Sequence, residues 1–538
     1  MTTKSIVSRL VAFLVILIFG FLLNYLFLPA WNIHSLGFLL FLFFVFILAL
    51  ISFGIIESFL GEVRIGTMIS IGGIAIIALL GIIAFFTSAQ IFHASSYRSL
   101  INIKDGNFAE EVVTADNIQN ISVVDVETAQ KVGDRTIAAL DNPSWYEVDN
   151  EYNLIIYKGE QYRLSPINYG GFFKYLNAST HGIPGYVLVN SITQEATLVT
   201  LDSPIRYSPS AYFSYYLTRH LRNQYPAYIF GTSFFEIDDD GNPYWITSVK
   251  TPTIGLVGGQ KESSFVITDA CTGESTEYTV ENLPEWIDHA FDLSYLMNLV
   301  YYKYEYINGF FNFSSTGVNR TSYNYRSEDF VGYNTTLSTD GVVFYTGVTP
   351  ANNAESVLGF ILANPRTGVV KFYDCSGAEE SSAQAAVQGL VQNLGYVATF
   401  PTIINVDGKP TYFMTLKDNA GLIQRYALCD VANYTQAFQA STLEETLAGY
   451  RKILGTEVTS QEEPIETLSV SGEIEFLYTA EIDGYTYFYF TLVDSNNLYM
   501  SSIENSNRQV LLQVGTIVKV EYTKSSEDGV YIVKSISF

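Results

Sequence analysis

The residues that could do chemistry begin with a run of acidic side chains, Glu236, Asp238 and Asp240, which Gly241 follows. Their spacing matches the first, third and fifth ligands of a calcium-binding loop. The twelfth position is Thr247, where that geometry needs a bidentate glutamate. We therefore favour a hairpin turn and keep the three carboxylates only as candidate metal ligands.

No catalytic pattern emerges from the remaining reactive residues. The five histidines are scattered along the chain: His34, His93, His181, His220 and His289. The patterns Gly-x-Ser-x-Gly, His-Glu-x-x-His and Ser-x-x-Lys do not occur. The stretch 255–259, Gly-Leu-Val-Gly-Gly, lacks the Lys-Ser/Thr of a phosphate loop, so it is interpreted as a turn. We expect no catalytic residue, no bound cofactor and a non-enzymatic protein.

Aromatic residues gather in one short segment. This segment supplies the candidate interface residues Tyr301, Tyr302, Tyr304, Tyr306, Phe310 and Phe311. Tyrosine and phenylalanine offer stiff contact area, and tyrosine adds a polar group, as at protein interfaces and glycan-binding surfaces. A buried strand or a helix end explains the same residues equally well. Both interpretations stay open on the sequence alone.

Charge and cysteine content narrow the partners and the cell compartment. The net charge is −25, and all of it lies beyond residue 90. That acidity disfavours nucleic acid and anionic lipid as partners of the polar part. Cys271, Cys375 and Cys429 form no CxxC pair, so a disulfide framework is not expected, although one bridge stays open. Such cysteine poverty is typical of exported proteins in bacteria that do not rely on disulfides.

Three uncharged apolar stretches, 10–30, 36–56 and 65–86, are each long enough to cross a bilayer. Lys4 and Arg9 precede the first stretch. Arg64 lies between the second and third, whereas the loop 31–35 carries neither lysine nor arginine. The positive-inside rule then predicts a cytoplasmic N-terminus and an extracytoplasmic region from about residue 90. We expect a plain anchor, and whether the first span is cleaved stays open.

One pattern recurs four times between residues 150 and 455. Each copy opens with a tight turn: Lys158-Gly159, Asp240-Gly241, Asp340-Gly341 or Asp407-Gly408. Each then has an apolar strand that ends at Asn190, Asp269, Asn364 or Asp430. A second strand follows in the first three copies. Each of the four copies then has a helix N-cap signal, at Ser208, Asn282, Ser376 or Ser441. Four tandem hairpin-plus-helix repeats are therefore predicted, with a membrane-proximal α/β segment at 91–149.

The order strand, Asp or Asn, Thr-Gly, strand resembles PepSY-type repeats of bacterial exported and membrane proteins. Thr272-Gly273 and Thr367-Gly368 carry the resemblance, and the first and fourth copies lack the Thr-Gly pair. The resemblance implies small α+β modules with a regulatory or binding role. It does not imply a catalyst.

The C-terminal part changes character. An acidic linker occupies 456–467, and alternating strands around Asp483-Gly484 and Asp528-Gly529 fill 468–538. This pattern predicts a small OB-like β-barrel. Many such barrels bind oligonucleotides, but this one carries nine acidic and four basic residues, so a docking module is favoured.

The predicted fold class is α+β, with three transmembrane helices, tandem PepSY-like repeats and a terminal barrel. The leading hypothesis is a non-enzymatic extracytoplasmic scaffold or binding protein in the bacterial cytoplasmic membrane. It would contact the lipid bilayer, other copies of itself, and an envelope protein or glycan. The alternatives are a sensor or regulator of an exported enzyme or transporter, and a cell-envelope hydrolase.

Overall fold

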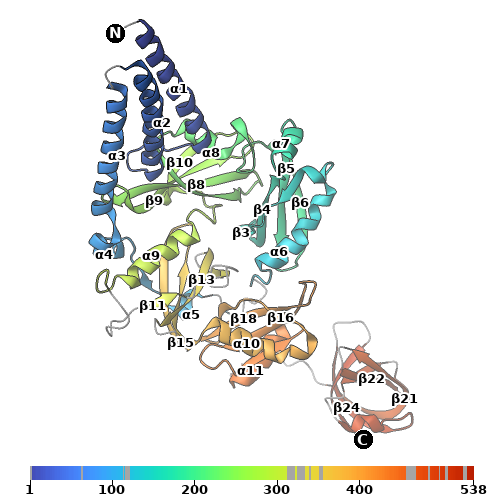
Figure 1. Cartoon of the computed structure of the whole chain (residues 1–538). Coiled ribbons are helices and arrows are strands. Elements are labelled where there is room, and N and C mark those ends of the chain that lie inside the picture. The colour runs from blue at the N-terminus through green and yellow to red at the C-terminus, as the bar shows by residue number, and fades with distance from the viewer. Residues whose placement is uncertain are drawn as a thin grey trace. The chain divides into compact units, whose positions relative to one another are not determined.

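The computed structural model divides the chain into two compact units, Met1–Thr456 and Glu457–Phe538 (Figure 1). It describes residues 3–61, 65–112, 114, 121–311, 321–323, 334–338, 341–350, 356–455, 468–482, 485–495, 497–502, 507–524 and 530–538. Arg64, Asp340, the linker 456–467 and the turns Asp483-Gly484 and Asp528-Gly529 lie outside the described residues.

The first unit begins with three apolar helices, α1 (Thr3–Phe27), α2 (Leu36–Leu60) and α3 (Ile65–Ser88). Each contains an apolar stretch long enough to cross a membrane, as predicted. The helix bounds differ from the predicted spans at several ends. Helix α1 stops at Phe27 because Leu28, with φ +46°, leaves the helical region and Pro29 follows.

Helix α2 continues four residues past the predicted end and so includes Glu57, which is buried. Its carboxylate accepts the backbone N–H groups of Gly66 at 2.8 Å and Thr67 at 3.0 Å. These are unpaired donors of the first turn of α3, so Glu57 caps that helix across the hairpin. Arg9 of α1 lies 3.6 Å from the same carboxylate.

Four sheets follow, which we number in chain order (Figure 1). The first contains β2 (Tyr146–Val148), β3 (Asn153–Tyr157), β4 (Glu160–Tyr169), β5 (Ile183–Asn190) and β6 (Ala196–Ile205). The second contains β7 (Ile229–Ile237), β8 (Pro243–Ile254), β9 (Gly258–Asp269) and β10 (Ser275–Thr279). The third contains β11 (Thr321–Tyr323), β12 (Asn334–Ser338), β13 (Gly341–Pro350), β14 (Ser356–Ala363) and β15 (Val370–Ala378), with β1 (Lys104–Asp105) parallel to β15. The fourth contains β16 (Val397–Ala398), β17 (Thr402–Val406), β18 (Lys409–Lys417), β19 (Ile423–Asp430) and β20 (Ala437–Ala440).

The same polar turn follows the corresponding strand of all four sheets. The side-chain oxygen of Asn190, Asp269, Asn364 or Asp430 accepts backbone N–H groups two or three residues further along. Such an Asx turn starts the return strand because a short acceptor side chain satisfies the turn's free donors. This turn gives the recurring Asn or Asp of the sequence a physical reason.

The helices are short and lie between or beside the sheets. They are α4 (Gln90–Arg98), α5 (Phe108–Glu111), α6 (Val126–Gly133), α7 (Phe172–Ala178), α8 (Leu217–Gln224), α9 (Leu293–Glu305), α10 (Glu380–Leu390) and α11 (Leu443–Leu454).

The predicted N-caps are wrong in all four copies. Ser208, Asn282 and Ser376 do not cap helices, because α8, α9 and α10 begin further along the chain. In the fourth copy the cap is Thr442, one residue after Ser441, and its side chain accepts the N–H of Glu445. Serine and asparagine also favour turns, so their presence alone does not fix where a helix starts.

Three apolar cores join the four sheets. One core combines residues of the first, second and fourth sheets, such as Leu164, Phe235 and Phe413. A second core joins the second sheet to the third, and another joins the third to the fourth. The sheets therefore share their interiors and do not act as independently packed domains.

The second unit is a closed five-stranded barrel, as predicted. Its strands are β21 (Leu468–Ile482), β22 (Tyr485–Leu492), β23 (Leu498–Ser502), β24 (Ile517–Lys524) and β25 (Val530–Ser537). They close in the order β21-β22-β23-β25-β24, with β23 and β25 parallel. Closure removes exposed sheet edges.

Candidate functional site

The predicted aromatic segment lies at the end of α9 and in the turn that follows. Tyr306 is 4% exposed and Tyr302 and Tyr304 are half-buried, whereas Tyr301 and Phe311 are exposed. The segment packs against α4, the helix that continues from α3. The structure therefore places it at a helix end, with its buried part inside the molecule.

Within this packing, five side chains form what we call the aromatic junction: Gln90, Tyr97, Tyr302, Tyr306 and Phe310. The Tyr306 ring lies between Tyr302, at 5.8 Å, and Phe310, at 5.9 Å. The Gln90 amide donates to the Tyr302 hydroxyl at 3.0 Å and accepts from the Tyr306 hydroxyl at 2.7 Å. Burial raises the pKa of both tyrosines, so the hydroxyls stay protonated as these bonds require.

The start of α9 is fixed to the second sheet by another buried group. The Tyr295 hydroxyl accepts the N–H of Glu262 at 3.2 Å. The Glu262 carboxyl accepts from Ser248 at 3.0 Å and lies 3.7 Å from Lys250. Burial raises the pKa of Glu262 to about 7, although Lys250 opposes the shift. Both ends of α9 are thus held by polar contacts.

The connection between α1 and α2 is held by α8. The Arg219 guanidinium donates to the carbonyl of Tyr25 at 3.0 Å and lies 4.0 Å from the centre of its ring. Arg222 donates to the carbonyl of Leu28 at 3.1 Å, and the N–H of Trp31 donates to Pro226 at 2.8 Å. The carbonyls of Tyr25 and Leu28 are free acceptors at the end of α1, so α8 completes that end.

A tight turn of the second sheet meets the end of α3. The N–H of Val257 donates to Ser88 Oγ at 3.0 Å. The Tyr97 hydroxyl donates to the Ser88 carbonyl at 2.6 Å and accepts from Gly259 at 3.2 Å. A Cβ on Gly255 would lie 2.0 Å from the Thr87 carbonyl. The glycines of the predicted turn therefore permit close backbone approach to α3.

The three candidate metal ligands have separate roles. One Asp238 oxygen accepts the N–H groups of Asp240 and Asn242, and the other accepts from the Asn242 side chain. Asp238 thus serves the β7–β8 turn, whereas Glu236 is fully buried. Among the residues that the structure describes, no group of three His, Cys, Asp or Glu side chains could hold a metal ion.

Glu236 instead belongs to a buried acid–histidine cluster that sequence reasoning missed. His289 Nδ1 lies 2.8 Å from Glu236 Oε1, and the His289 N–H donates to the same oxygen. Asp288 accepts the N–H of Ile156 on the first sheet at 2.6 Å. The His289 ring lies 6.0 Å from Phe344 on the third sheet. The cluster therefore lies where the first, second and third sheets meet. Its two paired side chains, Glu236 and His289, are 53 positions apart in the sequence.

Burial favours the uncharged forms throughout this acid–histidine cluster. It raises the pKa of Glu236 well above its ordinary value, and it raises that of Asp288 to about 7. It lowers the pKa of His289 to about 4. Within the described part of the chain, Glu236 Oε2 and His289 Nε2 have no hydrogen-bond partner.

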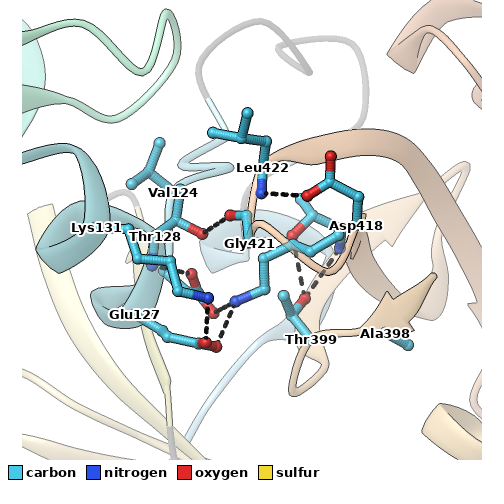
Figure 2. A network of polar contacts seen from close by, with 12 residues as sticks. Val124, Glu127, Thr128, Lys131, Ala398, Thr399, Asp418, Gly421 and Leu422 are labelled. Atoms are coloured by element: carbon cyan, nitrogen blue, oxygen red, sulfur yellow. Dashed lines mark hydrogen bonds and ion pairs between the residues drawn. The ribbon is translucent and has the colours of Figure 1, made fainter.

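A polar network joins α6 and its N-cap residue, Asp125, to the fourth sheet (Figure 2). Lys417 donates to Asp125 and Glu127, both at 2.8 Å, and Lys131 lies 2.8 Å from Glu127. Hydrogen bonds from Lys131 and Lys417 lower the pKa of Glu127 to about 2. Burial lowers the pKa of Lys417, but the two carboxylates outweigh it and the net shift is upward. The network fixes α6 to β18.

A cleft of about 460 Å³ lies beside the first sheet. Its lining includes Asp134, Glu147, Asp149, Asn150 and Asn168. Asn168 donates to Asp149 at 2.6 Å, so part of this polar surface is satisfied internally. Burial raises the pKa of Asp134.

The cysteines are the remaining reactive side chains. Cys271, Cys375 and Cys429 are free, and burial raises the pKa of each thiol, which disfavours the reactive thiolate. Comparison with protein-family models gives no match, and comparison with curated proteins gives no significant match either.

Proposed function

We propose that the protein is a non-enzymatic scaffold or binding protein, anchored in the cytoplasmic membrane of a bacterium by α1–α3. The observation that carries the proposal is the attachment of α8 to the end of α1, of the second sheet to the end of α3, and of α9 to α4, the helix that follows α3. The contacts of Arg219, Val257 and Gln90 described above supply it. Such an attachment suits a protein that must hold binding surfaces at a set place beside the bilayer.

The same contacts support an extracytoplasmic position for the sheets. The end of α1, the loop before α2 and the end of α3 all contact residues beyond position 200, so they lie on one side. Lys4 and Arg9 lie near the opposite end of α1. The positive-inside rule places that end in the cytoplasm. Protease added to intact cells tests this orientation, and failure to digest the sheets contradicts it.

The barrel supplies the proposed docking surface. Its strand order is that of OB barrels, and its segment 510–517 exposes Val510, Leu511, Val514 and Ile517. Exposed apolar side chains so close together are typical of protein contact surfaces. An acidic barrel with this surface suits a protein partner or a second copy of the chain better than nucleic acid.

Light scattering of the full chain in detergent tests self-association. We expect a protein mass above the 60.1 kDa of one chain, reduced to one chain by Ile517→Asp. Tyr478→Asp, also exposed on the barrel, is the matched control. A strictly monomeric wild type rejects self-association. Cross-linking in native membranes then tests an envelope partner, and adducts that Ile517→Asp does not reduce reject the docking role.

A second candidate is a sensor or regulator of an exported enzyme or transporter, acting through PepSY-like modules. The acid–histidine cluster favours it, because its protonation would alter contacts among three sheets. Affinity purification from membranes is the test. Recovery of only further copies of this chain contradicts this alternative.

The third candidate, a cell-envelope hydrolase, would use the carboxylates of the cleft beside the first sheet. Hydrolysis of glycans commonly needs two carboxyl groups that face one bond. Solubilisation of purified cell wall, lost in Glu147→Gln but kept in the exposed control Glu195→Gln, would support it. No release by the wild type rejects it.

A further inference from the structure

Five apolar side chains form an exposed surface on the first unit, which we call the α7 aromatic cluster: Phe172, Phe173, Leu176, Tyr212 and Phe213. Helix α7 contributes three of them, and the loop before α8 contributes the others. Phe173 is 78% exposed and Phe213 is 47% exposed. Phe172 lies 5.1 Å from Tyr212 and 6.1 Å from Phe213, so the two elements present one continuous surface.

The cluster is tied directly to the end of α1. Arg219 donates to the carbonyl of Phe213 at 2.7 Å and to the carbonyl of Tyr25 at 3.0 Å. One guanidinium group therefore spans the distance between the cluster and the last turn of α1. The membrane-spanning stretch of α1 ends at Phe27, so this turn marks the level of the bilayer surface.

Charge distinguishes this region from the rest of the protein. The chain carries 54 acidic residues, yet none lies within 161–194 or 203–235, the two segments that contain the cluster. These segments do hold Lys174, which is exposed on α7, and Arg219. Acidic residues are well tolerated on a surface that faces only water, because water solvates carboxylates. They are disfavoured on a surface beside lipid phosphates, because the negative phosphates repel carboxylates.

We propose that the α7 aromatic cluster inserts into the interfacial zone of the bilayer that α1 crosses, so that the first sheet is held on the membrane surface. Phenylalanine and leucine enter the acyl boundary, while Lys174 reaches the phosphates. The proximity to α1, the exposed rings and the missing acidic residues all point to lipid as the occupant. This contact goes beyond the proposed binding role, and it rests on the proposed crossing of the bilayer by α1.

Quenching by brominated lipid tests the contact. The full chain carrying Phe173→Trp is placed in nanodiscs of ordinary or brominated phosphatidylcholine, and the wild-type signal is subtracted to remove the four native tryptophans. Tyr434→Trp is the matched control, because Tyr434 is a 46% exposed aromatic residue beside the fourth sheet. Both substitutions keep an exposed aromatic ring, so both variants should fold.

We expect brominated lipid to reduce the fluorescence of the new tryptophan at 173 at least twofold and to leave the tryptophan at 434 unchanged. Equal signals in both lipids overturn the proposal. If an unquenched tryptophan at 173 also emits at short wavelength, protein and not lipid covers the cluster, which overturns it as well. Equal quenching at 173 and 434 also overturns it, because bromine would then report no specific contact.

Discussion

The molecule carries two aromatic groups beside its apolar helices, and they differ in their polar partners. In the aromatic junction, Tyr302 and Tyr306 both bond to the Gln90 amide. In the α7 aromatic cluster, the most exposed ring is Phe173, which has no polar group at all. Tyrosine can be buried inside a protein when its hydroxyl has a partner, whereas an exposed phenylalanine needs an apolar environment from elsewhere.

This difference indicates separate roles for the two groups. The junction is built from residues more than 200 positions apart, and it joins α4 to α9 inside the first unit. The α7 aromatic cluster is built from neighbouring segments and leaves its rings outside. Internal packing should therefore dominate the stability effects of the junction, and the cluster should contribute almost nothing to folding.

The largest expected effect is that of Tyr306→Ala in the junction. The substitution removes a ring that is stacked on both sides. It also removes the hydroxyl that donates to the side-chain oxygen of Gln90. The free energy of unfolding should therefore fall by about 3 to 5 kcal/mol. Thermal unfolding of the full chain in mild detergent measures it. Tyr434→Ala, an exposed residue, is the control. Equal midpoints for the two variants would show that the junction contributes no packing energy.

The next effect concerns the start of α9 and depends on pH. Burial raises the pKa of Glu262 to about 7. A carboxyl group with a raised folded pKa stabilises fully below its unfolded pKa of about 4.3, and this stability is lost as pH rises through about 7. Glu262→Gln should therefore match the wild type near pH 4 and exceed it by about 2 kcal/mol near pH 8.

Unfolding midpoints measured from about pH 4 to about pH 8 test this effect. Glu274→Gln, in an exposed turn of the same sheet, should follow the wild type throughout. Parallel curves for all three proteins would exclude Glu262 as a source of the pH dependence.

How far the sequence predicts this structure depends on how local each signal is. The apolar helices and the Lys158-Gly159 turn need only neighbouring residues, and the structure shows both. The closed barrel also followed from alternation and turn residues. The pairing of Glu236 with His289 joins residues far apart in the chain. A scattered histidine gives no sign of such a partner before the fold is known.

The aromatic segments show the same limit. The cluster of tyrosines at 301–306 was visible in the sequence, but its burial depends on Gln90 and Tyr97, which precede it by some 200 residues. Phe172 and Phe173 form a shorter aromatic run, which by itself predicts no surface. The absence of acidic residues across 161–194 was the signal that could have found them.

A smaller effect is expected for Arg219→Lys, which alters the tie between the α7 aromatic cluster and α1. Lysine keeps the charge but cannot donate to the carbonyls of Phe213 and Tyr25 with the fork geometry of arginine. The loss should be about 1 kcal/mol in unfolding. Introduced into the Phe173→Trp protein, it should also weaken quenching by brominated lipid. Unchanged quenching would mean that the cluster reaches the bilayer without this arginine.

The smallest effect is that of Phe173→Ser. Because the ring is 78% exposed, it loses little contact with water on folding, and its removal should change the free energy of unfolding in detergent by less than about 0.5 kcal/mol. In the bilayer the same substitution removes an inserted side chain, so any cost should appear only with lipid present. Unfolding in detergent and in nanodiscs separates the two. A loss above about 1 kcal/mol in detergent would mean that Phe173 packs against protein, and the contrast between the two aromatic groups would then fail.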